Sequence, residues 1–464
     1  MSTGDKTGNM ASLEAFIAAN RFGFGAKPGE LGKIASDPKA WALAQLDVRF
    51  IRNERLDALG QSVEPPKDLI DFLKKQATTP LEENLKKIKD LQQDSLHAMI
   101  RRYTEDVGTR MRATAESDAP LFERLVQFWS NHFTVSAVKW GDMPVVVSFE
   151  RDAIRPHVLG DFETLLVSST RHPAMLIYLD NIESLGPRSP AGVKSGRGLN
   201  ENLAREIMEL HTLGVDGGYT QSDVTEFAKV LTGWNVTGES TDGAWSWKYR
   251  YDAKSHEPGV KKLLGMEYAE NGEKETREVL HDLAFHPSTA KFIAKKLARH
   301  FISDDPPQSA IDRLAAIFTE NKGQLLPVYK ELIALDEVWR LPLPKLKTPN
   351  EFILSVLRAT NMDAEDTRLL AAARDLGQMP FTAVSPAGWS DEAKDWMSTE
   401  SLLQRLGVAQ LVARTIYTRV NPLELLESTI GPVVTEKTRA VVTAAGSAFE
   451  AITLLLASPE FQRR

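Results

Sequence analysis

Residues 200–214 read Asn-Glu-Asn-Leu-Ala-Arg-Glu-Ile-Met-Glu-Leu-His-Thr-Leu-Gly, and this stretch decides the fold class. Its apolar residues recur at helical spacing, which predicts an amphipathic helix in which each residue turns the chain by about 100°. Asn200 is expected to cap the N-terminus, and Gly214 to end the helix in a left-handed conformation. The helix therefore has one apolar arc that faces a core and one polar arc whose surroundings decide its role.

The polar arc of this helix supplies the first candidate site residues, which are Asn202, Arg205, Glu206 and Glu209. Apolar segments flank the helix, and buried carboxylates need partners. We therefore predict a central, mostly buried helix in which these four side chains form one hydrogen-bonded network. The alternative interpretation is a solvated face with Glu–Arg pairs.

Composition narrows the class of protein. The chain has 464 residues, of which 42% are hydrophobic, and its net charge is −7. This apolar content is sufficient for a large core, and the negative charge argues against a nucleic-acid partner, which would need a basic stripe. The sequence contains no cysteine, which excludes disulfides, thiolate nucleophiles and cysteine-based metal sites.

No apolar run is long enough to predict a membrane span. Residues 1–10 are polar and show no signal peptide, so they are expected to form a disordered tail. The expected protein is soluble, and both the cytoplasm and the periplasm stay open as its compartment.

Hydrophobic periodicity predicts a mainly α protein, with one large multi-helical domain over residues 11–464 that forms a single body or two lobes. Residues 435–457 are expected to form one last long helix. Near 235–268 the pattern changes, because Trp245, Trp247, Tyr249 and Tyr251 alternate with polar residues, which predicts a small β-hairpin insertion. Segments 181–198 and 377–389 are rich in glycine and proline and are expected to be loops that can cover a site.

Several short motifs in the chain resemble those of a known family. They read Asn20-Arg-Phe-Gly-Phe-Gly25, Phe128-Trp-Ser-Asn-His-Phe133, His172-Pro-Ala-Met-Leu-Ile-Tyr-Leu-Asp-Asn181, the stretch 200–214, Gly217-Gly-Tyr-Thr-Gln-Ser-Asp-Val224, Leu231-Thr-Gly-Trp234 and Leu454-Leu-Leu-Ala-Ser-Pro-Glu-Phe-Gln-Arg463. In this order they resemble the bacterial domain of unknown function 1800 family from about residue 11 to the end. The resemblance implies a shared fold without an established reaction, and the cofactor stays unknown.

The family resemblance also suggests a partner protein and a class of substrate. Members are often encoded beside an exported domain of unknown function 1501 protein that looks sulfatase-like. By analogy, this implies work on the cell envelope or on polysaccharides, a saccharide ligand and that exported protein as a partner. The chain departs from the family at two places, with Ser130 where a histidine is frequent and Glu257 where aspartate is usual.

Two histidines are candidate catalytic groups. His132 shares an inward stripe with Leu125 and Phe128, which is typical of a hydrogen-bonded core histidine but also suits a buried base. Because Ser130 replaces the second imidazole, we predict no metal site there. His256 precedes Glu257, and this neighbouring pair suits either a general base or a simple turn.

The full candidate set combines carboxylates with these histidines. The catalytic candidates are Glu206, His132, Glu209, Asp180 and His256, and the substrate-binding candidates are Asn202, Arg205, Trp129, Trp234 and Trp247. Paired carboxyls can cleave a glycosidic bond and tryptophans can stack on sugars, which favours a hydrolase or lyase. The alternative is a core filled by tryptophans in a non-catalytic scaffold or partner protein.

The enzyme hypothesis makes a geometric prediction. His132 and Glu206 are expected within about 8 Å of each other, close enough to act on one substrate directly or through a water. They should lie at the base of a cleft roofed by the loops at 181–198 and 377–389.

Overall fold

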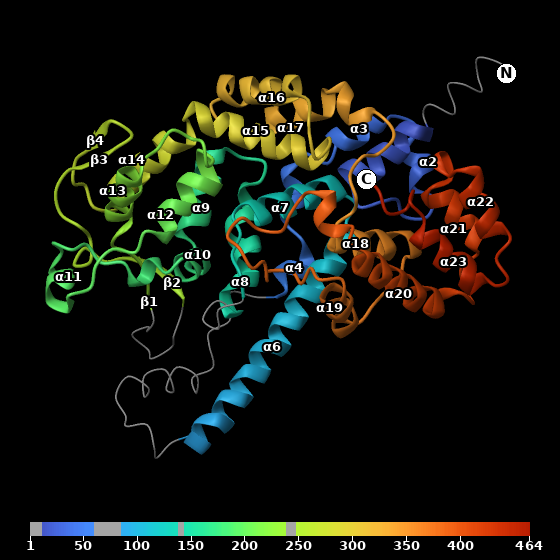
Figure 1. Ribbon diagram of the computed structural model, residues 1–464, viewed down its shortest axis with the longest axis horizontal. Coiled ribbons are helices and arrows are strands. Elements are labelled where there is room, and N and C mark those ends of the chain that lie inside the picture. Colours follow the sequence, from blue (N-terminus) through green and yellow to red (C-terminus); the bar gives the residue numbers. More distant parts are fainter. Residues whose placement is uncertain (1–11, 60–84, 138–142, 238–246) are drawn as a thin grey trace.

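The computed structural model describes residues 12–59, 85–137, 143–237 and 247–464 (Figure 1). Helices hold 62% of the residues and strands 4%, which confirms the prediction of a mainly α protein. In the part of the chain that is described, none of the helices has the length and apolar character needed to cross a membrane. The expected tail at residues 1–10 lies outside the described residues.

Helix α7 (Pro120–His132) runs through the centre of the molecule (Figure 1). Its start has the usual features of a helix N-terminus, because Pro120 occupies the first turn and the Ser117 hydroxyl accepts a hydrogen bond from the amide of Ala119. Most of its residues are buried, so α7 carries polar side chains into the interior. The other N-terminal elements are η1 (Ala18–Phe22), α2 (Glu30–Ile34), α3 (Pro38–Leu43), η2 (Val48–Ile51), α4 (Glu54–Asp57), α6 (Leu85–Glu116), α8 (Met143–Phe149), η3 (Glu150–Ile154) and η4 (Arg155–His157).

The stretch 200–214 is helical, but it is not one regular α-helix. Helix α12 (Asn202–Glu206) continues as the π-helix η6 (Ile207–Thr212), and Gly214 then adopts a left-handed conformation with φ of 83°. A π-turn is wider than an α-turn, so the arcs counted at about 100° per residue shift after Glu206. The neighbouring elements are α9 (Phe162–Arg171), α10 (Pro173–Tyr178), η5 (Asn181–Glu183), α11 (Pro190–Ser195) and α13 (Gln221–Leu231).

The predicted β insertion is confirmed as two antiparallel hairpins. Strand β1 (Trp234–Thr237) pairs with β2 (Lys248–Tyr251), with Trp234 opposite Tyr251. Strand β3 (Lys261–Leu263) pairs with β4 (Met266–Tyr268). Trp245, part of the predicted alternation, lies outside the described residues.

Three helices form a layer along one side of the molecule, drawn in yellow at the top of Figure 1. They are α15 (Pro287–Phe301), α16 (Gln308–Glu320) and α17 (Leu325–Ala334), and α16 packs against both of the others. The green segments, with both hairpins and α14 (Glu273–Ala284), lie at one end of this layer, and the orange and red helices lie at the other.

The C-terminal helices differ from prediction at one point. Residues 435–457 form two helices, because Gly446 interrupts the run and Ser447 caps the second helix through the amide of Glu450. The elements of this region are η7 (Asp336–Trp339), α18 (Pro349–Thr360), α19 (Asp366–Asp375), η8 (Ala393–Trp396), α20 (Thr399–Ile416), α21 (Pro422–Thr429), η9 (Gly431–Val433), α22 (Glu436–Thr443) and α23 (Ala448–Ala457).

Candidate functional site

A cavity of about 120 Å³ lies where α7, α15, the start of α18 and the segment 378–391 meet. Engineered cavities of roughly this size, on the order of 150 Å³, hold a molecule such as benzene. The predicted loop at 377–389 does line this cavity, together with His132. The other predicted cover, 181–198, contains the short helix α11 and is not part of the cavity wall.

Four buried polar atoms on the cavity-lining residues have no hydrogen-bond partner within the described part of the protein. They are Gln127 Nε2, His132 Nδ1, Asn350 Oδ1 and Trp389 Nε1. Buried polar groups in folded proteins are nearly always paired, either within the protein or with a ligand or ordered water. Two donors and two acceptors without partners therefore belong to residues that line one cavity.

The roles of the two amide side chains follow from their mutual contact. Asn350 Nδ2 donates to Gln127 Oε1 at 2.9 Å, and the Asn350 backbone amide donates to Gln378 Oε1 at 2.8 Å. These bonds fix the orientation of Gln127 and Asn350. One donor on Gln127 and one acceptor on Asn350 remain for a ligand.

His132 is neutral and presents an acceptor. Burial lowers the pKa of His132 far below its ordinary value, with Lys296 and His211 acting in the same direction. His132 Nε2 lies 3.1 Å from the backbone oxygen of His211. That oxygen can only accept, so Nε2 carries the hydrogen and Nδ1 is left with a lone pair.

Lys296 brings an amine to the same cavity. Its side chain is half-buried, and no hydrogen bond or ion pair joins its Nζ to any residue that the structure describes. The Nζ atom lies 5.7 Å from the centre of the Phe292 ring. Burial lowers the pKa of Lys296 to about 8, although the nearby Asp391 opposes the shift. An amine with this pKa exchanges a proton close to neutral pH.

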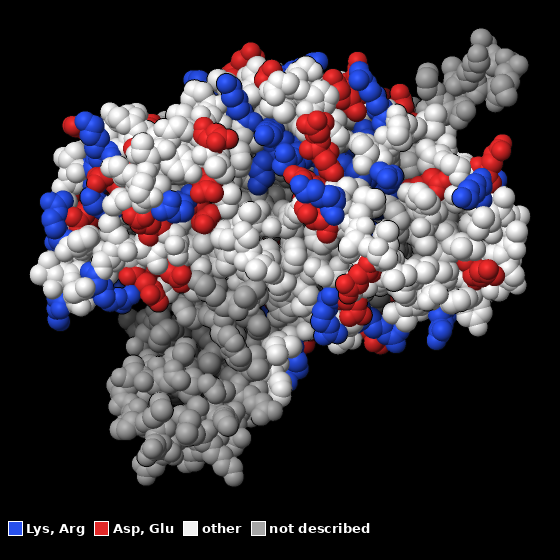
Figure 2. All heavy atoms as spheres, viewed as in Figure 1, with Lys and Arg blue, Asp and Glu red and all other residues white. Residues whose placement is uncertain are grey.

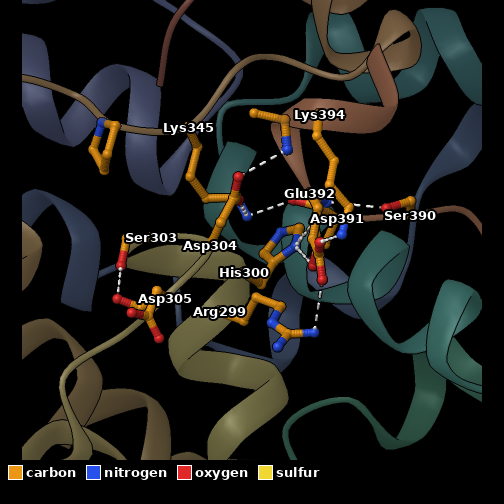
Figure 3. A network of polar contacts seen from close by, with 12 residues as sticks. Arg299, His300, Ser303, Asp304, Asp305, Lys345, Ser390, Asp391, Glu392 and Lys394 are labelled. Carbon is orange, nitrogen blue, oxygen red and sulfur yellow. Dashed lines mark hydrogen bonds and ion pairs between the residues drawn. The ribbon is translucent and has the colours of Figure 1, made fainter. Parts of the chain in front are cut away.

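His300 lies one helical turn after Lys296 and is bound on both sides of its ring. Its Nδ1 donates to Asp391 at 2.9 Å, as Figure 3 shows, and its Nε2 lies 3.4 Å from Arg124 Nη1. Burial lowers the pKa of His300 to about 4 despite the neighbouring Asp391. A neutral ring whose two nitrogens are both engaged positions Asp391 and has no free site for proton transfer.

Asp391 remains a carboxylate in this environment. Burial would raise its pKa, but His300, Lys345 and Arg464 outweigh burial and hold the pKa of Asp391 below its ordinary value. The Lys345 amine also donates to the backbone oxygen of Asp391 at 2.6 Å and to Asp304 at 2.7 Å (Figure 3). The segment after α19 is therefore anchored beside the cavity by charged contacts.

A buried ionic cluster forms the floor behind the cavity. Glu351 binds Arg124 and, at 2.8 Å, Arg464 Nε, and it accepts a hydrogen bond from the backbone amide of Thr348 at 2.8 Å. Arg464 also donates to the backbone oxygen of His300 at 2.6 Å. The cluster ties α7, α15, α18 and the end of the chain together, which holds the cavity walls in one arrangement.

The polar arc of 200–214 forms a different network from the predicted one, which was wrong. Arg205 binds Glu201 at 3.1 Å and Gln221 at 2.9 Å, and within the described ranges no hydrogen bond joins Asn202, Arg205, Glu206 and Glu209. Asn202 is exposed and the other three are half-buried. Burial and Glu209 raise the pKa of Glu206 while Arg205 opposes them, and Glu206 makes no hydrogen bond or ion pair with the residues that the structure describes.

The remaining sequence candidates lie apart from the cavity wall. Trp129 is a core residue whose indole donates to Tyr329 Oη at 2.6 Å, and Trp234 packs edge-on against Tyr249 at 5.4 Å. Trp247 is half-buried, and Asp180 adopts a left-handed conformation with φ of 57° before η5. Only His132 among the ten candidates lines the cavity.

His256 pairs with a different acid from the one beside it in sequence. Its Nε2 lies 3.1 Å from Glu275 and 3.2 Å from Lys261 Nζ, and all three side chains are buried. Glu257 instead binds Arg188 at 2.7 Å. Of the two alternatives for His256 and Glu257, the structure contradicts the general-base pair and agrees with the simple turn, since residues 253–255 form a turn. The buried trio supports the fold around β3 and α14.

The cavity-lining residues that sequence reasoning missed come from separate segments. Lys296 and His300 share one face of a predicted helix, which is a visible signal, but this spacing is common in surface helices. Nothing in the spacing of Gln127, Asn350 and Trp389 indicates that they converge. No group of three His, Asp or Glu side chains within the described segments is arranged to share a metal ion.

Comparison with known protein families assigns the chain to one family. A family model described as a protein of unknown function, DUF1800, matches residues 17–463. The chain belongs to the DUF1800 family. No curated protein matches it, and no solved structure does. Membership in the family confirms the resemblance of the ordered motifs but assigns no reaction, so the function has to be argued from the cavity.

Charge on the molecular surface agrees with a small-molecule site rather than a polyanion site. Figure 2 shows Lys and Arg interspersed with Asp and Glu over the face in view, with a cluster of both signs near its middle. On this face, no single sign of charge dominates, as a nucleic-acid surface would require.

Proposed function

We propose that this protein is a hydrolase or lyase that takes a small polar group of its substrate into the cavity between α7, α15 and segment 378–391. The observation that supports the proposal is that four residues with an unpartnered buried polar atom line one cavity together with Lys296. Perturbed ionisable groups in such cavities are typical of active sites.

Lys296 is the group proposed to move the proton. Its pKa of about 8 leaves roughly a tenth of the amine neutral at neutral pH. The neutral amine takes a proton from a water that attacks the substrate, or from a substrate carbon, and the resulting ammonium returns it to the leaving group. The proton count is unchanged over one cycle, so no redox partner is needed.

The neighbouring groups have complementary roles in this proposal. Gln127 Nε2 and Trp389 Nε1 are fixed donors that can stabilise negative charge as it develops on the substrate. His132 Nδ1 and Asn350 Oδ1 accept hydrogen bonds and orient the group that enters. The cavity volume of about 120 Å³ limits that group to one small substituent, such as one carried by an envelope saccharide.

The test compares wild-type protein with Lys296→Met on aryl esters, amides, glycosides and uronate-containing oligosaccharides, with elimination followed by ultraviolet absorbance. Lys296→Met should lose at least about a hundredfold in turnover, as general acid–base groups do. Lys295→Met is the matched control, because Lys295 is the exposed neighbour on the same helix. Full activity in Lys296→Met, or no wild-type turnover above the uncatalysed rate with any member of the panel, contradicts the proposal.

A further inference from the structure

A second cavity lies between residues 13–16, the segment 341–343 and the helices α22 and α23. Its volume is about 800 Å³, within the range of sites that hold a drug-sized molecule. It shares no lining residue with the cavity around Lys296. Its occupant is therefore independent of the proposed reaction.

The wall of this second cavity is mostly apolar and comes from segments far apart in the chain. Phe16, Leu343 and Val442 are buried at 2%, 5% and 3% exposure and form its deep part. Leu341 and Val441 are 39% and 44% exposed and lie nearer its mouth. Exposed apolar side chains around a cavity favour an apolar ligand. When such a ligand binds, the apolar surface of the ligand and that of the cavity wall are both removed from water.

The polar residues of this cavity gather at one end. Lys437 and Thr438 lie in the first turn of α22, and Val441 and Val442 follow one turn later. Glu460 is bound to that same first turn, since it accepts from the Thr435 amide at 3.0 Å and from the Thr438 hydroxyl at 3.1 Å. The cavity therefore changes from polar to apolar along the axis of α22.

The charged residues of the wall sum to a net positive charge, because Lys437 and Arg463 line it together with Glu460, the one acid among the described lining residues. Arg463 donates to the Pro344 carbonyl at 3.1 Å, whereas Lys437 is exposed and makes no hydrogen bond or ion pair with any residue in the described ranges. Both oxygens of Glu460 already accept hydrogen bonds. An anionic head group therefore has the unengaged Lys437 amine available to it, whereas a cationic head group has one carboxylate that is already occupied.

We infer that this cavity binds a single-chain amphiphile with an anionic head, such as a fatty acid, with its chain against Phe16, Leu343 and Val442 and its carboxylate at Lys437. The apolar wall accepts the chain, and the polar end fixes its direction. This mode of binding needs no change in the cavity around Lys296.

The test titrates the purified full-length protein with the fluorescent fatty acid dansyl-undecanoate. Wild-type protein should bind it, and Val441→Glu should weaken binding at least about tenfold, because the new carboxylate enters the apolar wall. Val441 is 44% exposed, so the variant should fold. Val193→Glu is the matched control, because Val193 is 71% exposed on α11 and lines neither cavity; its affinity should equal that of wild type.

A second variant tests the head group. Lys437→Glu should weaken dansyl-undecanoate severalfold and leave competition by an uncharged long-chain alcohol unchanged. The inference is overturned if wild type does not bind the probe, if Val441→Glu binds as well as Val193→Glu, or if alkyl ammonium ions compete as well as alkyl carboxylates. A more than tenfold gain in affinity after deletion of residues 1–11 would identify that segment as the occupant and would also overturn it.

Discussion

Asn131 and Trp389 are joined by two reciprocal hydrogen bonds between a side chain and a backbone. Asn131 Nδ2 donates to the Trp389 carbonyl at 2.9 Å, and the Trp389 amide donates to Asn131 Oδ1 at 2.8 Å. The chain approaches α7 closely here, because a Cβ on the preceding Gly388, whose φ is 81°, would lie 2.5 Å from the Asn131 carbonyl oxygen. This clamp fixes the segment that carries Trp389 and Asp391 against the end of α7.

Asn131→Ala should release that segment. Both backbone groups of Trp389 lose their partner, which should lower the free energy of unfolding by about 1–3 kcal/mol. Hydrogen exchange in residues 378–391 should rise more than elsewhere, and urea unfolding gives the change in stability. Asn271→Ala serves as the control, since exposed Asn271 makes a single side-chain hydrogen bond at 3.3 Å. Equal effects from the two substitutions would argue against the clamp.

Lys296→Met should stabilise the protein at neutral pH. Burial holds the pKa of Lys296 at about 8 in the folded state, below its ordinary 10.5, so the folded state carries the charge at a cost. One pKa unit corresponds to about 1.4 kcal/mol, and water near this half-buried side chain reduces the gain to about 1–2 kcal/mol.

The stability gain of Lys296→Met should depend on pH. In wild type the unfolded state binds the Lys296 proton more tightly between pH 8 and 10.5, so this residue makes stability rise across that window. The advantage of Lys296→Met should therefore be full below pH 8 and shrink towards pH 10.5. Urea unfolding across this window measures it, with Lys295→Met as the exposed control. An advantage that is independent of pH would reject a lowered pKa at Lys296.

Glu351→Gln should be strongly destabilising. The substitution leaves Arg124 and Arg464 buried without their carboxylate, and breaking a buried ion pair in this way costs about 3–5 kcal/mol. Arg124 and Arg464 outweigh the effect of burial and hold the pKa of Glu351 below its ordinary 4.5. Its stabilising contribution is therefore present above pH 4.5 and lost as the pH falls below it. Glu427→Gln, at an exposed pair with Arg439, should change stability by less than about 1 kcal/mol.

The sequence predicts the helices well where local signals act alone. Helix α7 follows from its proline and its apolar stripe, and the Thr220–Asp223 capping box of α13 is present as its spacing indicates. The alternation after Trp247 indicates the hairpin, because residues of one strand face opposite sides. Errors arise where the backbone departs from the regular period, as at the π-turn after Glu206, and where a run is interrupted, as at Gly446 within residues 435–457.

The cavity is harder to predict than the helices, because it depends on contacts between segments that are distant in the sequence. Its polar atoms come from Gln127, Lys296, Asn350 and Trp389, which lie on four segments that only the tertiary fold brings together. Each of these residues alone is compatible with an ordinary helix face or loop. His132 was found because its inward stripe is a local property of α7, and local properties are what periodicity reports.

Glu206→Gln distinguishes the cavity from the polar arc of 200–214 as the active site. Glu206 is half-buried, makes no hydrogen bond with the described residues, and has a pKa raised by burial and by Glu209. A raised pKa means that its protonated form is favoured in the folded state, so stability from this group is full below pH 4.5 and is lost as the pH rises through the folded-state pKa.

The variant should therefore match wild type at about pH 4 and have a higher free energy of unfolding than wild type at about pH 7. Urea unfolding at both values measures this difference. Turnover should be unchanged, because Glu206 does not line the cavity that contains Lys296. Loss of turnover in Glu206→Gln with intact stability, together with an active Lys296→Met, would move the active site to the helix at 200–214 and would restore the carboxylate mechanism that its sequence first suggested.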